Sequence, residues 1–301
     1  MQIISRPDDV AEALSSTALT VSRSDEPVGD AESLQARMAR FSDGVGHLRR
    51  RALVQARLSG LGVLEEATAH RIGPLVGAKA NPFDVMPLAR TVPVAVLAAA
   101  LGVAEVDVGP VTSLTAALCD ALAPSLEARS QPDDIDHVAR KLTTLLRPLG
   151  PVDDDVIATL SVLFQARDAT AALIGATLLA AGVEPSGSVD QLVESVLRHE
   201  APVHCTRRFA VADVVVGGTT LTKGSSVLVM LNAPQSRPGA EAATFGAGAH
   251  ACPGSSPARE IARGFVSAVL AGGWRPVPEQ PVTYEPRPNL RLPSRVMVQR
   301  S

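Results

Sequence analysis

The feature that most constrains this chain is a glycine-rich loop around a cysteine, from Phe245 to Gly254, with the sequence FGAGAHACPG. Glycine lets the backbone turn tightly and approach a neighbour closely, so amide groups of the loop can point at the sulfur of Cys252. The residues that follow, from Ala258 to Phe265, predict a helix. A thiolate near a helix N-terminus and among amide donors is stabilised as the anion. The loop therefore predicts an activated Cys252.

The other two cysteines lack such a frame. Cys119, in the segment AALCD, and Cys205 are interpreted as small buried hydrophobes. The anionic thiolate predicted at Cys252 is what a haem iron needs as its proximal ligand, where electron donation from sulfur favours O–O cleavage. Hydrogen bonds to the sulfur tune that donation. The loop thus indicates a haem-thiolate site.

The order Phe-Gly-x-Gly-x-His-x-Cys-x-Gly, followed by Ala-Arg and Glu260, resembles the haem-ligand loop of the cytochrome P-450 family. The resemblance implies haem b as cofactor, with its iron bound by Cys252. It also implies that the other residues of the motif belong to the cofactor-binding site; these are Phe245, Gly246, His250 and Gly254.

Composition sets the broad class of protein. The chain has 301 residues, of which 46% are hydrophobic, enough for one large core, and we expect a single domain over residues 1–301. A net charge of −3 argues against a nucleic-acid partner. Met1 to Asp9 lack the apolar region of a signal peptide, and the apolar run from Val92 to Ala104 is too short to span a bilayer. We expect a cytoplasmic protein with no membrane partner.

The expected fold class is mainly α with small β-sheets (α+β). A strand at Gln2–Ile4 and a helix at Pro7–Leu14 resemble early elements of the cytochrome P-450 fold, which implies a fold truncated at the N-terminus. The segment from Ala233 to Thr244 is short where the family has a longer meander, and Arg237 is the arginine available there.

A basic helix is predicted after Asp43, a plausible N-cap. His47 and Arg51 are spaced i, i+4 and share one face of it. Out of context this is a solvated charged helix. By resemblance it carries His47 and Arg51 to a haem propionate, and Arg208 occupies the place of another propionate-binding arginine; guanidinium groups suit carboxylates.

A long helix is predicted from Asp153 to Gly182, and it contains Asp168, Ala169 and Thr170. It resembles the family's helix that crosses the haem face, where an acid followed directly by threonine relays protons. Asp168 matches the acid, Ala169 stands in the place of the alcohol, and Thr170 is one residue, or about 100° of helix, further on. Asp168 and Thr170 are therefore the candidate catalytic residues, and water or the substrate could also deliver protons.

A further helix resembles the family's Glu-x-x-Arg segment. Arg198 matches the arginine, Ser195 stands in the place of the glutamate, and Glu194 is displaced by one residue. Serine cannot form the bidentate pair of carboxylate and guanidinium. We expect an altered clamp, with Glu194 and Arg198 paired on the surface at i, i+4.

The main hypothesis from the resemblance is a haem-thiolate oxidoreductase of the monooxygenase type. It would oxidise a small organic molecule in secondary metabolism, with electrons from a ferredoxin-type partner. Ala169 and Ser195 keep two alternatives open: a haem catalyst that does not activate oxygen, and a degenerate auxiliary protein that binds a biosynthetic enzyme. An activated cysteine has a use in the first alternative and none in the second.

Overall fold

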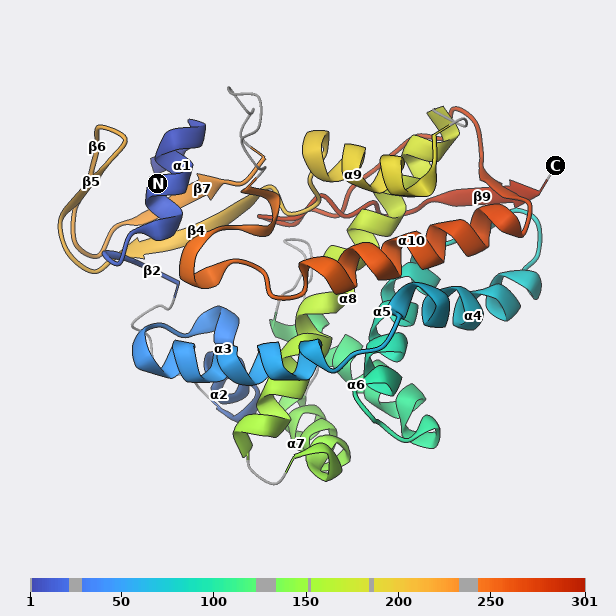
Figure 1. The fold of residues 1–301 in the computed structure, drawn as a ribbon, viewed down its shortest axis with the longest axis horizontal. Coiled ribbons are helices and arrows are strands. Elements are labelled where there is room, and N and C mark those ends of the chain that lie inside the picture. Colours follow the sequence, from blue (N-terminus) through green and yellow to red (C-terminus); the bar gives the residue numbers. More distant parts are fainter. Residues whose placement is uncertain are drawn as a thin grey trace.

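The computed structural model describes residues 2–21, 29–122, 134–150, 153–183, 187–232 and 243–300. Helices predominate in it, as Figure 1 shows. Their bounds are α1 Pro7–Ser15, α2 Gly29–Ala36, α3 Gly44–Ser59, α4 Leu64–Gly77, α5 Met86–Ala100, α6 Glu105–Leu122, α7 Ile135–Leu146, α8 Asp153–Val183, α9 Val189–His199 and α10 Ser255–Ala271. Four short 3-10 turns join them: η1 Ala39–Phe41, η2 Arg147–Leu149, η3 Ala243–Phe245 and η4 Gly248–His250.

The strands of the described residues form three small sheets, so the expected fold class is confirmed. Their bounds are β1 Gln2–Ile4, β2 Leu19–Thr20, β3 Phe83–Asp84, β4 Cys205–Ala210, β5 Val214–Val216, β6 Thr219–Leu221, β7 Ser226–Met230, β8 Trp274–Pro276 and β9 Met297–Arg300. The sheet orders are β1-β7-β4-β2, β3-β9-β8 and β5-β6. Strand β1 is parallel to β7, and the β5–β6 hairpin turns through Gly217 and Gly218, both at positive φ.

Helix α8 is the centre of the structure. It runs between α9 and α7 in Figure 1 and packs against α3, α5, α6, α7, α9 and α10. Three aspartates in its first turn stabilise the helix, because their negative charges lie at the positive N-terminal end of the helix dipole. Among the described residues it is the helix long and apolar enough to cross a membrane, but 78% of its most apolar window is buried inside the protein. It is a core helix, and its bounds agree with the predicted ones, Asp153 to Gly182, to within one residue.

Two hydrophobic clusters meet beside the Cys252 loop. The larger cluster surrounds α8, and the smaller one joins α1 to the β1–β7–β4–β2 sheet. Leu14 and Leu231 of the smaller cluster, and Val54 and Leu97 of the larger one, line the same cavity. The functional site therefore lies at the junction of the two clusters. The predicted meander segment at 233–242, with Arg237, lies outside the described residues.

Candidate functional site

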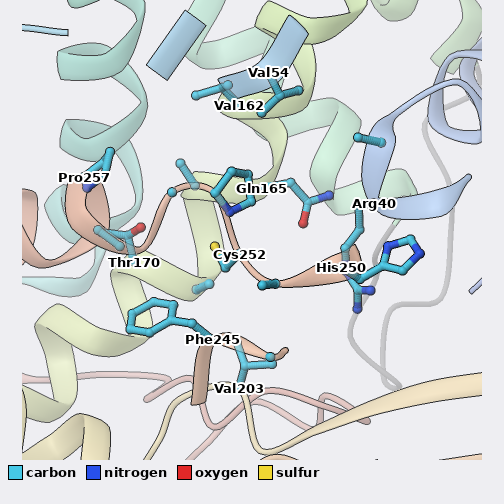
Figure 2. A pocket seen from close by; sticks show the side chains of 18 of the residues that line it. Arg40, Val54, Val162, Gln165, Thr170, Val203, Phe245, His250, Cys252 and Pro257 are labelled. Carbon is cyan, nitrogen blue, oxygen red and sulfur yellow. The ribbon is translucent and has the colours of Figure 1, made fainter. Parts of the chain in front are cut away.

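A cavity of about 240 Å³ lies between the Cys252 loop and α8. Figure 2 shows the sulfur of Cys252 inside it, with Phe245 on one side and Gln165, Val162 and Val54 on the other. The α8 wall is one helical stripe, whose members are Ser161, Val162, Gln165, Ala166, Ala169, Thr170 and Leu173. The cavity is therefore lined by the Cys252 loop on one side and by α8 on the other.

Backbone hydrogen bonds fix the Cys252 loop. The Cys252 amide donates to the carbonyl of Phe245 at 2.7 Å, and Gly246 turns the chain with φ of 71°. Gly248 also has positive φ, 64°, and a Cβ there would lie 2.9 Å from the carbonyl oxygen of Leu14 in α1. Both glycines are thus required by geometry, as the sequence predicted.

Cys252 lies directly before α10 and is a free thiol exposed to the cavity. Burial raises the pKa of its thiol above the ordinary value. The amide of Gly254 and nearby positive charges oppose this shift; these charges are Arg40, Arg51 and Arg259. The expectation that the loop alone stabilises a thiolate is therefore wrong, because desolvation outweighs these donors. A coordinating metal cation is the kind of group that deprotonates such a thiol outright.

Two guanidinium groups meet at one edge of the cavity. Arg208 donates to the hydroxyl of Thr206 at 3.0 Å, and Arg40, in η1, donates to the same oxygen at 3.3 Å. Burial lowers the pKa of both groups, to about 10 for Arg208, where the charge of Arg40 also contributes. Neither has a carboxylate within ion-pair distance among the described residues. Neighbouring buried cations of this kind fit an anionic ligand.

Arg208 was predicted from the sequence, whereas Arg40 was missed. Arg40 lies before the basic helix, outside the His47–Arg51 spacing that drew attention to that region. Its proximity to Arg208 depends on how η1 packs against β4, which no local pattern encodes.

The predicted pair on α3 faces the Cys252 loop. The ring nitrogens of His47 lie 2.9 Å from the carbonyl oxygens of Ala39 and Ala249, and Arg51 donates to the carbonyl of Ala251 at 2.6 Å. Both side chains also line the cavity. They therefore hold the loop backbone in place beside the cavity, and their contact with a propionate stays a prediction.

His250 lies in the cavity wall next to His47, with ring centroids 4.0 Å apart. Its pKa is lowered to about 4, chiefly by burial and also by the neighbouring His47 and Arg208, while Asp43, 3.4 Å from its Nε2, opposes the shift. The imidazole is thus neutral at pH 7. It lies close to the cations that would face an anionic ligand.

The two candidate catalytic residues of α8 lie in different places. Thr170 is buried and lines the cavity. Asp168 is not among the cavity-lining residues; its carboxylate faces guanidinium groups at 3.3 to 3.8 Å, those of Arg90, Arg167 and Arg287. Each residue of a helix turns the side chain through about 100°, so Asp168 and Thr170 point in directions about 200° apart. Thr170 therefore lies on the cavity stripe, whereas Asp168 lies just outside it.

The clamp behind the Cys252 loop differs from the expected surface pair. Glu194 of α9 accepts from Nε of Arg259 in α10 at 2.7 Å, and Arg198 is exposed. The guanidinium of Arg259 also lies over the ring of Phe245, 4.5 Å from its centre. The i, i+4 expectation is wrong because Glu194 faces α10. The pair links α9, α10 and the loop.

Gln165 is a cavity residue that the sequence interpretation did not single out. Its Nε2 is buried and has no hydrogen-bond partner among the described residues. The signal that could have found it is helical spacing, because it lies one turn before Ala169 on the same face.

The sequence and the fold of this chain are similar to those of known proteins. No family model matches the chain. An alignment over 144 positions, which covers 40% of this chain, shows 31% identity to the cytochrome P-450 monooxygenase DoxA of Streptomyces sp. (strain C5). That alignment spans 34% of the relative's length.

Solved structures match over nearly the whole chain. P450BioI, in complex with an acyl carrier protein carrying hexadec-9Z-enoic acid, has a TM-score of 0.81 at 19% identity, covering 99% of this chain and 92% of that one. CalO2 has a TM-score of 0.79 at 21% identity, covering 99% and 90%. CYP109E1 from Bacillus megaterium, in complex with testosterone, has a TM-score of 0.76 at 16% identity, covering 99% and 92%.

The chain has the fold of solved cytochrome P-450 structures over nearly its whole length, and part of its sequence is similar to a cytochrome P-450 monooxygenase. Members of that family bind haem b through a cysteine thiolate. The residues present fit this group: a thiol open to the cavity, apolar walls, and at the edge Arg40 and Arg208, which form no ion pair with a carboxylate in the part of the chain that the structure describes.

Proposed function

We propose that this chain is a haem-thiolate oxidoreductase, a single domain over residues 1–301, that oxidises a small organic molecule. The observation that carries the proposal is the placement of Cys252 opposite α8, with the cations Arg40 and Arg208 at the edge of the same cavity. Cys252 would ligate the iron. The propionates would lie against the cationic edge formed by Arg40 and Arg208, with Arg51, His47 and the neutral His250 beside it.

Haem held by a cysteine thiolate supplies an electron-rich iron centre suited to oxygen insertion and related oxidations. The protein's part is positioning and exclusion of water. Phe245 lies beside Cys252 in the cavity and would help to exclude water from the iron-bound sulfur. The Thr170 hydroxyl would hold a proton in the α8 wall, and the carboxylate of Asp168 faces the guanidinium groups of three arginines beside that wall.

The substrate and partners follow from the cavity and the relatives. The walls are mostly aliphatic, with Val54, Leu58, Val162 and Leu173 among them, which suits a largely apolar molecule. The structural relatives were solved with a fatty-acyl carrier protein and with testosterone. We infer a small-molecule substrate from secondary metabolism, an electron donor of the ferredoxin type, and a cytoplasmic location.

The test is haem content after expression with haem supplied, compared between the natural chain and Cys252→Ala. We expect about one haem per chain in the first and loss of the thiolate-bound form in the second, with both chains folded by circular dichroism. A purified, folded natural chain that takes up no haem would overturn the proposal.

A second candidate function rests on Ala169 and Ser195, which depart from the family pattern at the alcohol and clamp positions. It is an auxiliary protein that binds a biosynthetic enzyme, or a haem protein that does not activate oxygen. Cys252→Ala separates the auxiliary role from the roles that use haem. An auxiliary role survives the substitution, whereas any role that uses haem does not.

A further inference from the structure

One polar group in the α8 wall has no partner in the protein. Gln165 lies in the stripe that faces Cys252, and its neighbours on that stripe include Val162, Ala166 and Ala169. Its amide Nε2 is buried and makes no hydrogen bond to any described residue. A buried donor left unpaired is destabilising, and native proteins satisfy nearly all such groups.

The position of Gln165 on the helix places its side chain in the wall of the cavity. It lies four residues before Ala169, one turn away on the same face, and five before Thr170. At Ala169, where the family pattern has an alcohol, this chain has a methyl group. An amide one turn earlier offers the α8 wall a donor that Ala169 lacks.

We infer that the side-chain amide of Gln165 donates a hydrogen bond to an acceptor atom of the small ligand held between α8 and Cys252. The inference deepens the proposed function and rests on it, because the ligand is the one that the haem iron binds. The aliphatic surroundings strengthen such a bond, since little water competes for the donor. The polarity and donors of this side of a haem decide how a bound ligand is handled.

Carbon monoxide on the reduced, haem-loaded protein is the probe, and the C–O stretching frequency in the infrared is the measurement. A donor to the oxygen of the bound ligand draws electron density toward it and weakens the C–O bond. Gln165→Leu removes the amide and nearly keeps the volume, so we expect the stretch to move to higher frequency. Ser161→Ala, one turn earlier on the same stripe, is the matched control and should move it less.

Each outcome decides the inference. An unchanged stretch in Gln165→Leu overturns it, and equal shifts in Gln165→Leu and Ser161→Ala overturn it too, because they report a general change of the cavity. Gln165→Met, unbranched and without a donor, replaces the leucine variant if that one does not fold. Absence of the thiolate-type absorption band in the natural chain overturns the proposed function itself. A normal band together with an unshifted C–O stretch in Gln165→Leu overturns only the role of Gln165.

Discussion

The cavity has two walls that are built differently. The Cys252 loop takes its shape from its own backbone, through the Cys252–Phe245 hydrogen bond and the positive φ of Gly246 and Gly248, and His47 and Arg51 of α3 fix it in place. The α8 wall is a face of a core helix, and which side chains reach the cavity depends on how α8 packs against its neighbours. The position of a side chain on the loop is set by the neighbouring residues of the loop. On the helix, by contrast, a shift of one residue turns a side chain through about 100° and can move it out of the cavity.

The largest effect is expected at the loop. Cys252→Ser removes the sulfur and leaves the loop backbone intact, so we expect the thiolate-bound haem form to disappear while the fold is kept. Absorption spectra measure the thiolate-bound haem form, and circular dichroism measures the fold. Retention of a thiolate-type spectrum in this variant would show that another residue ligates the iron.

The next effect concerns the cationic edge. Arg208→Leu and Arg40→Leu each remove a charged donor from a buried site, and such bonds contribute about 1.5–3 kcal/mol. We therefore expect haem affinity to fall roughly 10- to 100-fold, measured as the rate of haem transfer to an acceptor protein. Arg198→Leu, exposed on α9, is the control and should leave this rate unchanged.

A smaller effect tests the backbone account of the loop. Gly248→Ala places a Cβ at positive φ and 2.9 Å from the Leu14 carbonyl oxygen, so we expect a loss of about 1–3 kcal/mol in the free energy of unfolding. Gly60→Ala is the control, because Gly60 has φ of −90° and open space around it. Equal unfolding midpoints in denaturant for the two variants would refute the close approach of α1.

The smallest effect tests the altered clamp. Glu194→Gln breaks the pair with Arg259, and Asp190→Asn breaks a pair between the same two helices, Arg263–Asp190 at 2.8 Å. Both pairs are partly exposed, so each contributes at most about 1 kcal/mol to stability. Because Arg259 also covers Phe245, we expect Glu194→Gln to lower the fraction of thiolate-bound haem more than Asp190→Asn does. The same fraction in both variants would make the Glu194 pair merely structural.

Much of the fold and the loop could be predicted from the sequence. The Cys252 loop, the hairpin at Gly217–Gly218 and the long α8 carry signals in adjacent residues, and all three appear in the structure. The pKa of Cys252 could not be predicted, because burial depends on the whole cavity.

The remaining differences concern side-chain direction. The partner of Glu194 depended on the α9–α10 packing, and the contact of Arg40 with Thr206 depended on the position of η1 against β4. Asp168 and Gln165 lie three residues apart on α8, and only Gln165 reaches the cavity. A family pattern can place an acid on the right helix without fixing which way it points in this chain.

The central claim is that Cys252 holds a haem iron in this cavity. The most direct measurement is the absorption spectrum of the purified protein, expressed with haem supplied, then reduced and exposed to carbon monoxide. The account predicts the strongly red-shifted band of a thiolate-bound haem in the natural chain and its absence in Cys252→Ala. A folded protein that shows no haem absorption, or the same spectrum in both chains, would contradict it.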